Sequence, residues 1–408
     1  MDTRLEAAHA RFESVLNEIV STSKVPLRRI AVSVYGFDYG ATLARAFCHK
    51  LFEECEPGTT RYRGKELDIV FAGLFDAVDR SMGTSIVLDY LLPLVNRVDD
   101  GECLPGPVKA ALHLVAAHEC RDTRRARLIG TSALTPRWEE RLVPGVSEDV
   151  GGGLRQEDAP HSRELHLASL HEMYRAAYRA GVPFPTLEKL NQEDKFVSSF
   201  FILKDHINGS SALDAAKGYS AAAGFQKPDA DAFLAHRRLY IRRLRGLWQL
   251  YHGQDDAYYE EEERLQRPFL GNEGSLASFL GFGGEPAEQT ARREKRLQEV
   301  RRSREGLRQE FGWLHAVASE ANRSRYGLTT DAERVLLSEW FFAPSTGTAF
   351  VVEDLLEFYL NDRHMISRMP PEDSTRKYFR VRAFDRPDPM KTKGFLPPVP
   401  PLSAYAVE

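Results

Sequence analysis

Residues 36–40, Gly-Phe-Asp-Tyr-Gly, have the spacing of a nucleophile elbow, G-x-S-x-G, whose central residue attacks a substrate carbonyl. Such an elbow is a sharp, strained turn from a strand into a helix, and its flanking glycines let the two elements approach closely. Here the central residue is Asp38 instead of serine. The alternative interpretation is an ordinary strand-to-helix turn in which Asp38 caps the helix.

The residues around this motif have the pattern of a buried strand followed by a helix. Residues 30–35 form a short β-branched run, and residues 39–52 are rich in alanine and leucine. Two further apolar runs, at 67–75 and 112–117, predict buried strands of the same sheet. Short apolar strands that alternate with helices favour an α/β fold with a mainly parallel sheet covered by helices.

Composition excludes several classes of protein. The chain has 408 residues, of which 42% are hydrophobic and 28% charged, which is typical of a globular protein with a substantial core. Its net charge of −4 argues against a nucleic-acid-binding scaffold. The first residues lack the apolar core of a signal peptide, and the most apolar stretch, 86–95, is too short to span a bilayer and contains Asp89. Four cysteines without a C-x-x-C pair favour a reduced, cytoplasmic origin, with leaderless export left open.

The second half of the chain reads as helical. The predicted helices outside the region of the motif are 2–20, 231–251, 288–318, 330–342 and 351–367. The acidic run 260–263 and the glycine-containing apolar stretch 269–282 fall in a predicted linker. The stretch 269–282 could form either a lid or a helix packed in the core. Arginines and glutamates alternate along 288–318, which predicts a solvated helix with many ion pairs or, alternatively, a contact with anionic lipid headgroups.

Several segments, in order along the chain, resemble the motifs of one family, the type VI secretion phospholipase effectors (type VI lipase effector 1). The blocks that carry the resemblance are residues 36–47 (GFDYGATLARAF), 71–78 (FAGLFDAV), 113–121 (HLVAAHECR), 144–153 (PGVSEDVGGG), 173–184, 358–364 (FYLNDRH) and 378–382 (YFRVR). Residues 205–330 match only loosely. The resemblance implies an α/β-hydrolase fold, cleavage of phospholipid esters, and no cofactor.

The resemblance also suggests how the chain is organised. We expect an α/β-hydrolase-like core over 1–204, a helical insert or cap over 205–330, helices that return to the core over 331–384, and a proline-rich tail over 385–408. The family begins with a strand that this sequence lacks, so the chain resembles a divergent and N-terminally shortened member. The partners implied are a phospholipid or membrane surface and a cognate immunity or secretion-apparatus protein.

The family's catalytic residues are only partly present. Asp149 matches the family's acid, and Asp76 is a second candidate carboxylate. Asp38 stands at the nucleophile position, and Tyr39 follows it where the family's backbone N–H supplies an oxyanion donor. The family's two late histidines fall at Ser147 and Asn361 here, so the expected base is missing.

Two other histidines, His364 and His171, are candidates for a replacement base. Three hypotheses follow: a catalytically silent descendant, an active hydrolase with Asp38 as nucleophile, Asp149 as acid and a replacement histidine as base, or one half of a split phospholipase. A carboxylate is ionised at neutral pH without a base, but the resulting ester still needs a histidine for hydrolysis. The silent descendant is therefore the preferred hypothesis.

A second group of polar residues, His113, His118 and Glu119, invites a metal interpretation. The H-x-x-x-x-H-E spacing places the two imidazoles on different faces of a strand or a helix, unlike H-E-x-x-H. We therefore expect hydrogen bonding within the core and no metal site.

Overall fold

The computed structural model of this chain describes residues 3–78, 103–121, 124–129, 137–154, 161–224, 226–267, 287–327, 329–343, 350–362 and 378–386. It forms two compact units, one of residues 1–239 and 348–408 and the other of residues 240–347. Each unit is described by itself below.

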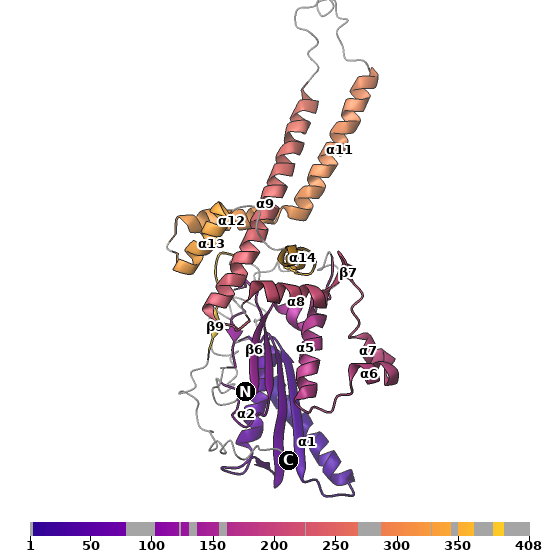
Figure 1. The fold of residues 1–408 in the computed structure, drawn as a ribbon, viewed down its shortest axis with the longest axis vertical. Helices are drawn as coiled ribbons and strands as arrows, with labels where there is room; N and C mark the ends of the chain where they lie inside the picture. The colour runs from indigo at the N-terminus through magenta and orange to yellow at the C-terminus, as the bar shows by residue number, and fades with distance from the viewer. Residues whose placement is uncertain are drawn as a thin grey trace, which may run out of the picture. The chain divides into compact units, whose positions relative to one another are not determined.

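A mainly parallel sheet forms the centre of the first unit (Figure 1). Its strands lie in the order β1-β3-β4-β6, all parallel, and β2 pairs antiparallel with β3. Their bounds are β1 Arg29–Phe37, β2 Arg61–Tyr62, β3 Lys65–Phe75, β4 Ala111–Ala116 and β6 Trp138–Val143. The predicted strands at 30–35, 67–75 and 112–117 are confirmed as β1, β3 and β4, and the α/β prediction is correct. Within the described residues β1 and β6 lie at the two edges of this sheet, and the split-enzyme hypothesis requires a further strand to add at such an edge.

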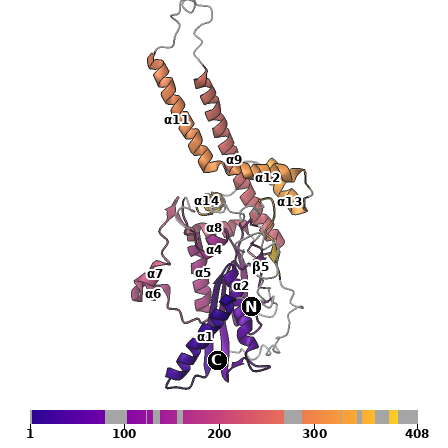
Figure 2. The same ribbon diagram turned by 180° about the vertical axis from the view of Figure 1, so that it is seen from behind.

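Apolar side chains cover both faces of the sheet because successive residues of a strand point to opposite faces. On one face, Ile69 and Leu74 of β3 pack with α1 and α2, which Figure 2 shows from behind. On the other face, Phe71 and Leu112 pack with Met173 of α5. The sheet is therefore the middle layer of a three-layer arrangement.

The first unit has further helices and short strands around this centre. The helices are α1 Thr3–Thr22, α2 Tyr39–Glu53, α4 Ser147–Gly151, α5 Leu165–Arg179, α6 Leu187–Glu193, α7 Lys195–Ser199, α8 Ala212–Ala223 and α14 Phe350–Phe358, and α9 Ala230–Gln266 begins here. The short strands are β5 Ala126–Arg127, β7 His206–Ile207, β8 Ser210–Ser211 and β9 Phe384–Asp385. Helix α14 begins within one residue of the predicted start at residue 351. It ends at Phe358, before the predicted end at residue 367, and residues 363–367 lie outside the described chain.

The second unit is helical and contains the remainder of α9 with α11 Ala287–Phe311, α12 Leu314–Arg325 and α13 Asp331–Phe342. The side chain of Thr330 accepts a hydrogen bond from the Glu333 amide and so caps α13. The predicted single helix over 288–318 is interrupted between α11 and α12. At this break Gly312 lies so close to Arg308 that a Cβ atom would be 2.4 Å from its carbonyl oxygen.

The prediction that residues 260–263 belong to a linker is wrong, because α9 continues through them to Gln266. Within this unit α9 and α11 lie side by side and antiparallel (Figures 1 and 2). Arg296 pairs with Glu261 at 2.9 Å, and Arg301 pairs with Glu262 at 2.8 Å. Ion pairs to α11 thus keep the acidic run helical, and the arginines of α11 have the paired, solvated role that the charge pattern predicts.

Three other sequence predictions fall wholly or partly outside the described residues. They are the apolar stretch 269–282, the stretch 86–95 and the proline-rich tail after residue 386. Among the helices of the described residues, none has the length and apolar character that crossing a membrane requires.

Candidate functional site

The turn at Asp38 has the strained backbone of an elbow. Asp38 follows β1 directly, precedes α2, and has φ 57° and ψ −129°, a conformation that L-residues seldom adopt. The Asp38 amide donates a hydrogen bond of 2.9 Å to the carbonyl of Phe75, which fixes the turn against the end of β3. Asp38 makes no side-chain capping bond to α2, so the alternative interpretation as an ordinary capped turn is not supported.

The two glycines of the motif have different roles. A Cβ atom on Gly36 would lie 2.3 Å from the carbonyl oxygen of Gly40 and 2.5 Å from the Cα atom of Ala41, so only glycine permits this approach of strand and helix. A Cβ atom on Gly40 would meet no atom within 4 Å. The steric requirement that the motif implies for both positions applies only to Gly36.

The Asp38 carboxylate forms an ion pair with Arg124. Its Oδ2 atom lies 2.6 Å from the Arg124 guanidinium, and the two side chains are 29% and 19% exposed. Its other oxygen, Oδ1, is buried and accepts no hydrogen bond from the described residues. Burial raises the pKa of Asp38, and the nearby carboxylates Asp76 and Glu148 raise it further, whereas Arg124 lowers it and does not fully compensate.

Charges of alternating sign continue from Arg124 into the protein. Arg124 contacts Glu148 at 3.5 Å, and Glu148 pairs with Arg121 at 2.7 Å. Arg121 also binds the buried Glu119 at 2.6 Å. Although burial alone would raise the pKa of Glu119, its attraction to Arg121 holds that pKa well below the ordinary range. The ion pair of Asp38 is thus the outer end of a network of alternating charges that reaches the buried Glu119.

Asp76 is fully buried at the end of β3 and has a positive φ of 44°. Arg382 binds both of its oxygens, at 2.6 and 3.0 Å, and the Ala116 amide donates to Oδ1 at 2.9 Å. The hydroxyl of Ser147 donates to Oδ2. A carboxylate with this many donors is a structural anion and has little capacity left to orient a catalytic base.

Asp149, the predicted acid, is fully buried at the start of α4 and is also fully engaged. The side-chain amide of Asn361 donates to its Oδ1 at 2.8 Å, and the backbone amides of Asn361 and Val146 donate to Oδ2 at 3.0 and 3.1 Å. Asn361 thus lies in the position from which a catalytic histidine would be oriented by the Asp149 carboxylate. The amide nitrogen of Asn361 is not basic, so it cannot act as the base of such a pair.

The remaining predicted site residues do not complete a triad in the described chain. His364 lies outside the described residues. His171 on α5 has its Nε2 atom 2.7 Å from the Phe201 carbonyl oxygen, and its Nδ1 atom has no hydrogen-bond partner among the described residues. Tyr39 is the first residue of α2, its side chain is buried, and the Arg4 guanidinium lies 4.9 Å from its ring centre. Its role as an oxyanion donor stays a prediction.

The residues that invite a metal interpretation form core hydrogen bonds. His113 binds Glu140 through Nδ1 at 2.9 Å and accepts the Ala77 amide at 3.0 Å. His118 accepts the Gly145 amide at 2.9 Å and contacts the Tyr219 hydroxyl at 2.9 Å. Both imidazoles therefore have both ring nitrogens engaged within the protein.

Another group, His9, Glu13 and Glu54, brings possible ligand atoms within 4.8 Å of one another. Its carboxylates already pair with Arg63 and Lys50, the latter at 3.2 Å, and His9 binds Glu54 at 2.8 Å. These contacts satisfy the group without an ion, and we assign it no metal.

The site lies at the carboxyl edge of the sheet, where parallel α/β proteins place their functional groups. Sequence reasoning found Asp38, Asp76 and Asp149 but missed Arg124 and Arg382, which neutralise the first two. Arg382 lies within residues 378–382, one of the blocks that resemble the family's motifs, and this was the only sequence signal for its role. No motif indicates Arg124. In this arrangement Asp38 and Asp76 are each paired with an arginine. The described residues contain no base within hydrogen-bond distance of Asp38.

No protein-family model and no curated protein matches this chain. Among solved structures, a protein from Pseudomonas aeruginosa described as uncharacterized is 18% identical, with a TM-score of 0.56 over 94% of this chain and 60% of its own length. The Tle1 effector, solved bound to the VgrG spike of the type VI secretion system, is also 18% identical, with a TM-score of 0.38 over 57% of this chain and 62% of its own. The chain thus spans about 60% of the length of each. A TM-score of 0.38 does not establish a common fold, and the first similarity shows the fold alone: a mainly parallel α/β sheet with flanking helices.

Proposed function

We propose that the chain is a lipase-related protein of the type VI effector family that has lost ester hydrolysis. The proposal is supported by the order of the resembling sequence blocks and above all by the ion pair of Asp38 with Arg124 on the elbow. The positions of the family's late histidines, Ser147 and Asn361, are each hydrogen-bonded to a candidate acid, Asp76 and Asp149. The proposal attributes the loss of hydrolysis to these replacements.

Loss of chemistry follows from the nature of these groups. A carboxylate held by a guanidinium is a weaker nucleophile than a free one, because attack would have to break the ion pair. Attack by Asp38 on a carboxylic ester would also give a mixed anhydride, which needs an activated water to resolve it. The partners that the proposal carries over are a phospholipid or membrane surface, an immunity protein and a secretion-apparatus protein.

Purified protein tests the proposal with p-nitrophenyl butyrate and a fluorogenic phospholipid as substrates. We expect hydrolysis at the buffer rate, unchanged in Asp38→Asn. Hydrolysis above that rate which Asp38→Asn abolishes would contradict the proposal and support the aspartate-nucleophile hypothesis.

A gain of activity provides the matched arm of this experiment. The double variant Asp38→Ser, Asn361→His restores a hydroxyl on the elbow and an imidazole beside Asp149, and we expect low but measurable turnover of p-nitrophenyl butyrate. Each single variant should stay at the buffer rate, because nucleophile and base act as a unit. A folded double variant without turnover would show that these two replacements do not account for the loss of activity.

A further inference from the structure

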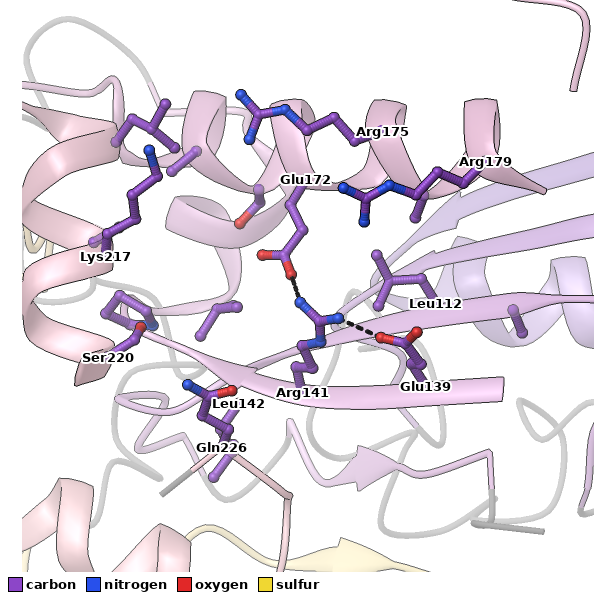
Figure 3. Close-up of a pocket in the computed structure, with 18 of the residues that line it drawn as sticks. Leu112, Glu139, Arg141, Leu142, Glu172, Arg175, Arg179, Lys217, Ser220 and Gln226 are labelled. Carbon is purple, nitrogen blue, oxygen red and sulfur yellow. Dashed lines mark hydrogen bonds and ion pairs between the residues drawn. The ribbon is translucent and has the colours of Figure 1, made fainter. Parts of the chain in front are cut away.

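A cavity of about 810 Å³ lies in the first unit between the sheet and two helices, away from the Asp38 site (Figure 3). Strands β4 and β6 contribute Leu112 and Arg141, helix α5 contributes Arg175 and Arg179, and helix α8 contributes Lys217. None of the residues in the network from Asp38 to Glu119 lines it. Its size is within the range of small-molecule pockets, about 300–1,000 Å³.

The lining of this cavity is strongly cationic. Its cationic residues are Lys109, Arg137, Arg141, Arg175, Arg179 and Lys217, and its acidic residues are Glu139 and Glu172. The six cations and two anions give a formal charge of 6 − 2 = +4, whereas the whole chain carries −4. A concave surface that concentrates charge opposite to that of the whole protein focuses its potential on an anionic ligand.

The ion pairs at this cavity use only part of that charge. Arg141 pairs with both Glu139 and Glu172, so the two acids of the lining are engaged by one arginine. Lys109 pairs with Asp68 outside the cavity at 2.7 Å. Arg175 and Arg179, one turn apart on α5, have no ion-pair partner among the described residues. Figure 3 shows both side chains extending from the same helix, and both residues are exposed.

The rest of the lining is largely apolar. It includes the aromatic ring of Phe71, the aliphatic side chains of Leu112, Val143 and Leu165, and alanines of α5 and α8. Phe71 and Leu112 belong to the core cluster on this face of the sheet and are each 2% exposed, so they support the cavity from below. The apolar surface open to a ligand includes the partly exposed Ala176 of α5 and Leu213 and Ala216 of α8. The ligand that such a site would hold therefore needs an apolar body as well as an anionic head.

We propose that this cavity binds an anionic amphiphile, with a phosphate or carboxylate head at Arg175 and Arg179 and an alkyl chain against Ala176, Leu213 and Ala216 of the α5 and α8 walls. A guanidinium presents donors in a fixed fork that matches both anions, so paired arginines favour such heads over neutral ones. Burial of the alkyl chain adds a favourable free energy that inorganic phosphate lacks. The site shares no residue with the Asp38 network and holds whether or not the protein has hydrolytic activity.

Isothermal titration of the full chain with monomeric octyl phosphate tests this proposal. We expect saturable binding, weakened about tenfold or more in the double variant Arg175→Gln, Arg179→Gln, and strengthened at low salt. The control is Arg11→Gln, Arg28→Gln, which removes the same charge at exposed positions outside the cavity and should leave the affinity unchanged. Octanoate should bind, and octyltrimethylammonium should not.

Two further measurements separate the parts of the proposal. Ala216→Trp places a bulky side chain on the α8 wall of the cavity and should abolish binding without any change of charge. Inorganic phosphate should bind at least about tenfold more weakly than octyl phosphate. Equal affinity in the two arginine double variants, or unchanged affinity in a folded Ala216→Trp, would overturn the site. Equal affinity for inorganic and octyl phosphate would overturn the amphiphile and leave a plain anion site.

Discussion

Asp38 combines the strained backbone of an elbow with a carboxylate that is held in an ion pair. The strained elbow is present, yet the carboxylate on it is bound to Arg124 at 2.6 Å. The side chains of Ser147 and Asn361 donate hydrogen bonds to the neighbouring carboxylates of Asp76 and Asp149. Residue by residue, the site is a set of ion pairs and hydrogen bonds in which the Asp38 Oδ1 atom still lacks a donor among the described residues.

At this scale we predict that Asn361→Ala destabilises the protein. The Asn361 side-chain amide donates to Asp149 at 2.8 Å, to the Ser162 carbonyl at 2.9 Å and to the Tyr359 carbonyl at 3.0 Å, all buried. Its removal leaves a buried carboxylate short of donors, at a cost of about 2–3 kcal/mol in the free energy of unfolding.

Urea denaturation followed by tryptophan fluorescence measures this loss. Asn17→Ala is the control, because Asn17 is exposed and only accepts a 3.3 Å bond from Arg63, so its effect should stay below about 0.5 kcal/mol. Equal urea midpoints for wild type and Asn361→Ala would show that Asp149 is satisfied without this amide.

At the scale of elements, the elbow depends on how closely β1 approaches α2. The contact is backbone against backbone at Gly36, and Gly151 plays a related part from α4, since a Cβ atom there would lie 1.9 Å from the Phe37 ring. The sequence spacing identifies the turn correctly but treats its two glycines alike. Which glycine is indispensable depends on the packing distance between the elements.

We therefore expect opposite effects from alanine at the two elbow glycines. Gly36→Ala must push α2 away from β1 and should lower the free energy of unfolding by at least about 2 kcal/mol. Gly40→Ala meets open space within α2 and should be neutral or stabilising by up to about 1 kcal/mol. Thermal unfolding of the two variants in parallel gives the comparison, and a similar loss in both would contradict the packing argument.

At the scale of the whole molecule, the protein divides into an α/β unit and a helical unit, both with buried apolar side chains. The first has apolar clusters on both faces of its sheet. In the second, ion pairs join α9 to α11, with Asp255 bound to Arg304 at 2.9 Å and to Arg308 at 3.1 Å. We expect the stability of this helical pair to respond to pH and salt more than the sheet does.

Asp255 carries the pH dependence of the helical pair. Hydrogen bonding to Arg304 and Arg308 lowers the pKa of Asp255 from 3.8 to about 2. Because the folded pKa lies below the ordinary value, this stabilisation is complete above about pH 4 and is lost as the pH falls towards 2.

Amide hydrogen exchange in α9 and α11, followed by mass spectrometry, measures this effect. At about pH 6, Asp255→Asn should exchange several-fold faster than wild type, equivalent to about 1 kcal/mol, and the difference should vanish near pH 2. Asp256→Asn is the control, because Asp256 is exposed and pairs only with the exposed His252. A difference that persists at low pH would assign the effect to something other than the Asp255 charge.

Local patterns in the sequence were enough to predict the alternation of strands and helices and the position of the elbow. The apolar runs at β1, β3 and β4 are long enough to predict their strands locally, and a Gly-x-Asp-x-Gly turn directly after one of them lies at its carboxyl end. The cap of α13 at Thr330 was predictable for the same local reason.

Which charges meet, in contrast, depends on the complete fold. The pairing of Asp38 with Arg124, the helical state of residues 260–263 against α11, and the cationic cavity between β6, α5 and α8 all join segments that are distant in sequence. No local pattern encodes such pairs, because the energy of a charge depends on its burial and on the neighbours that the complete fold brings to it.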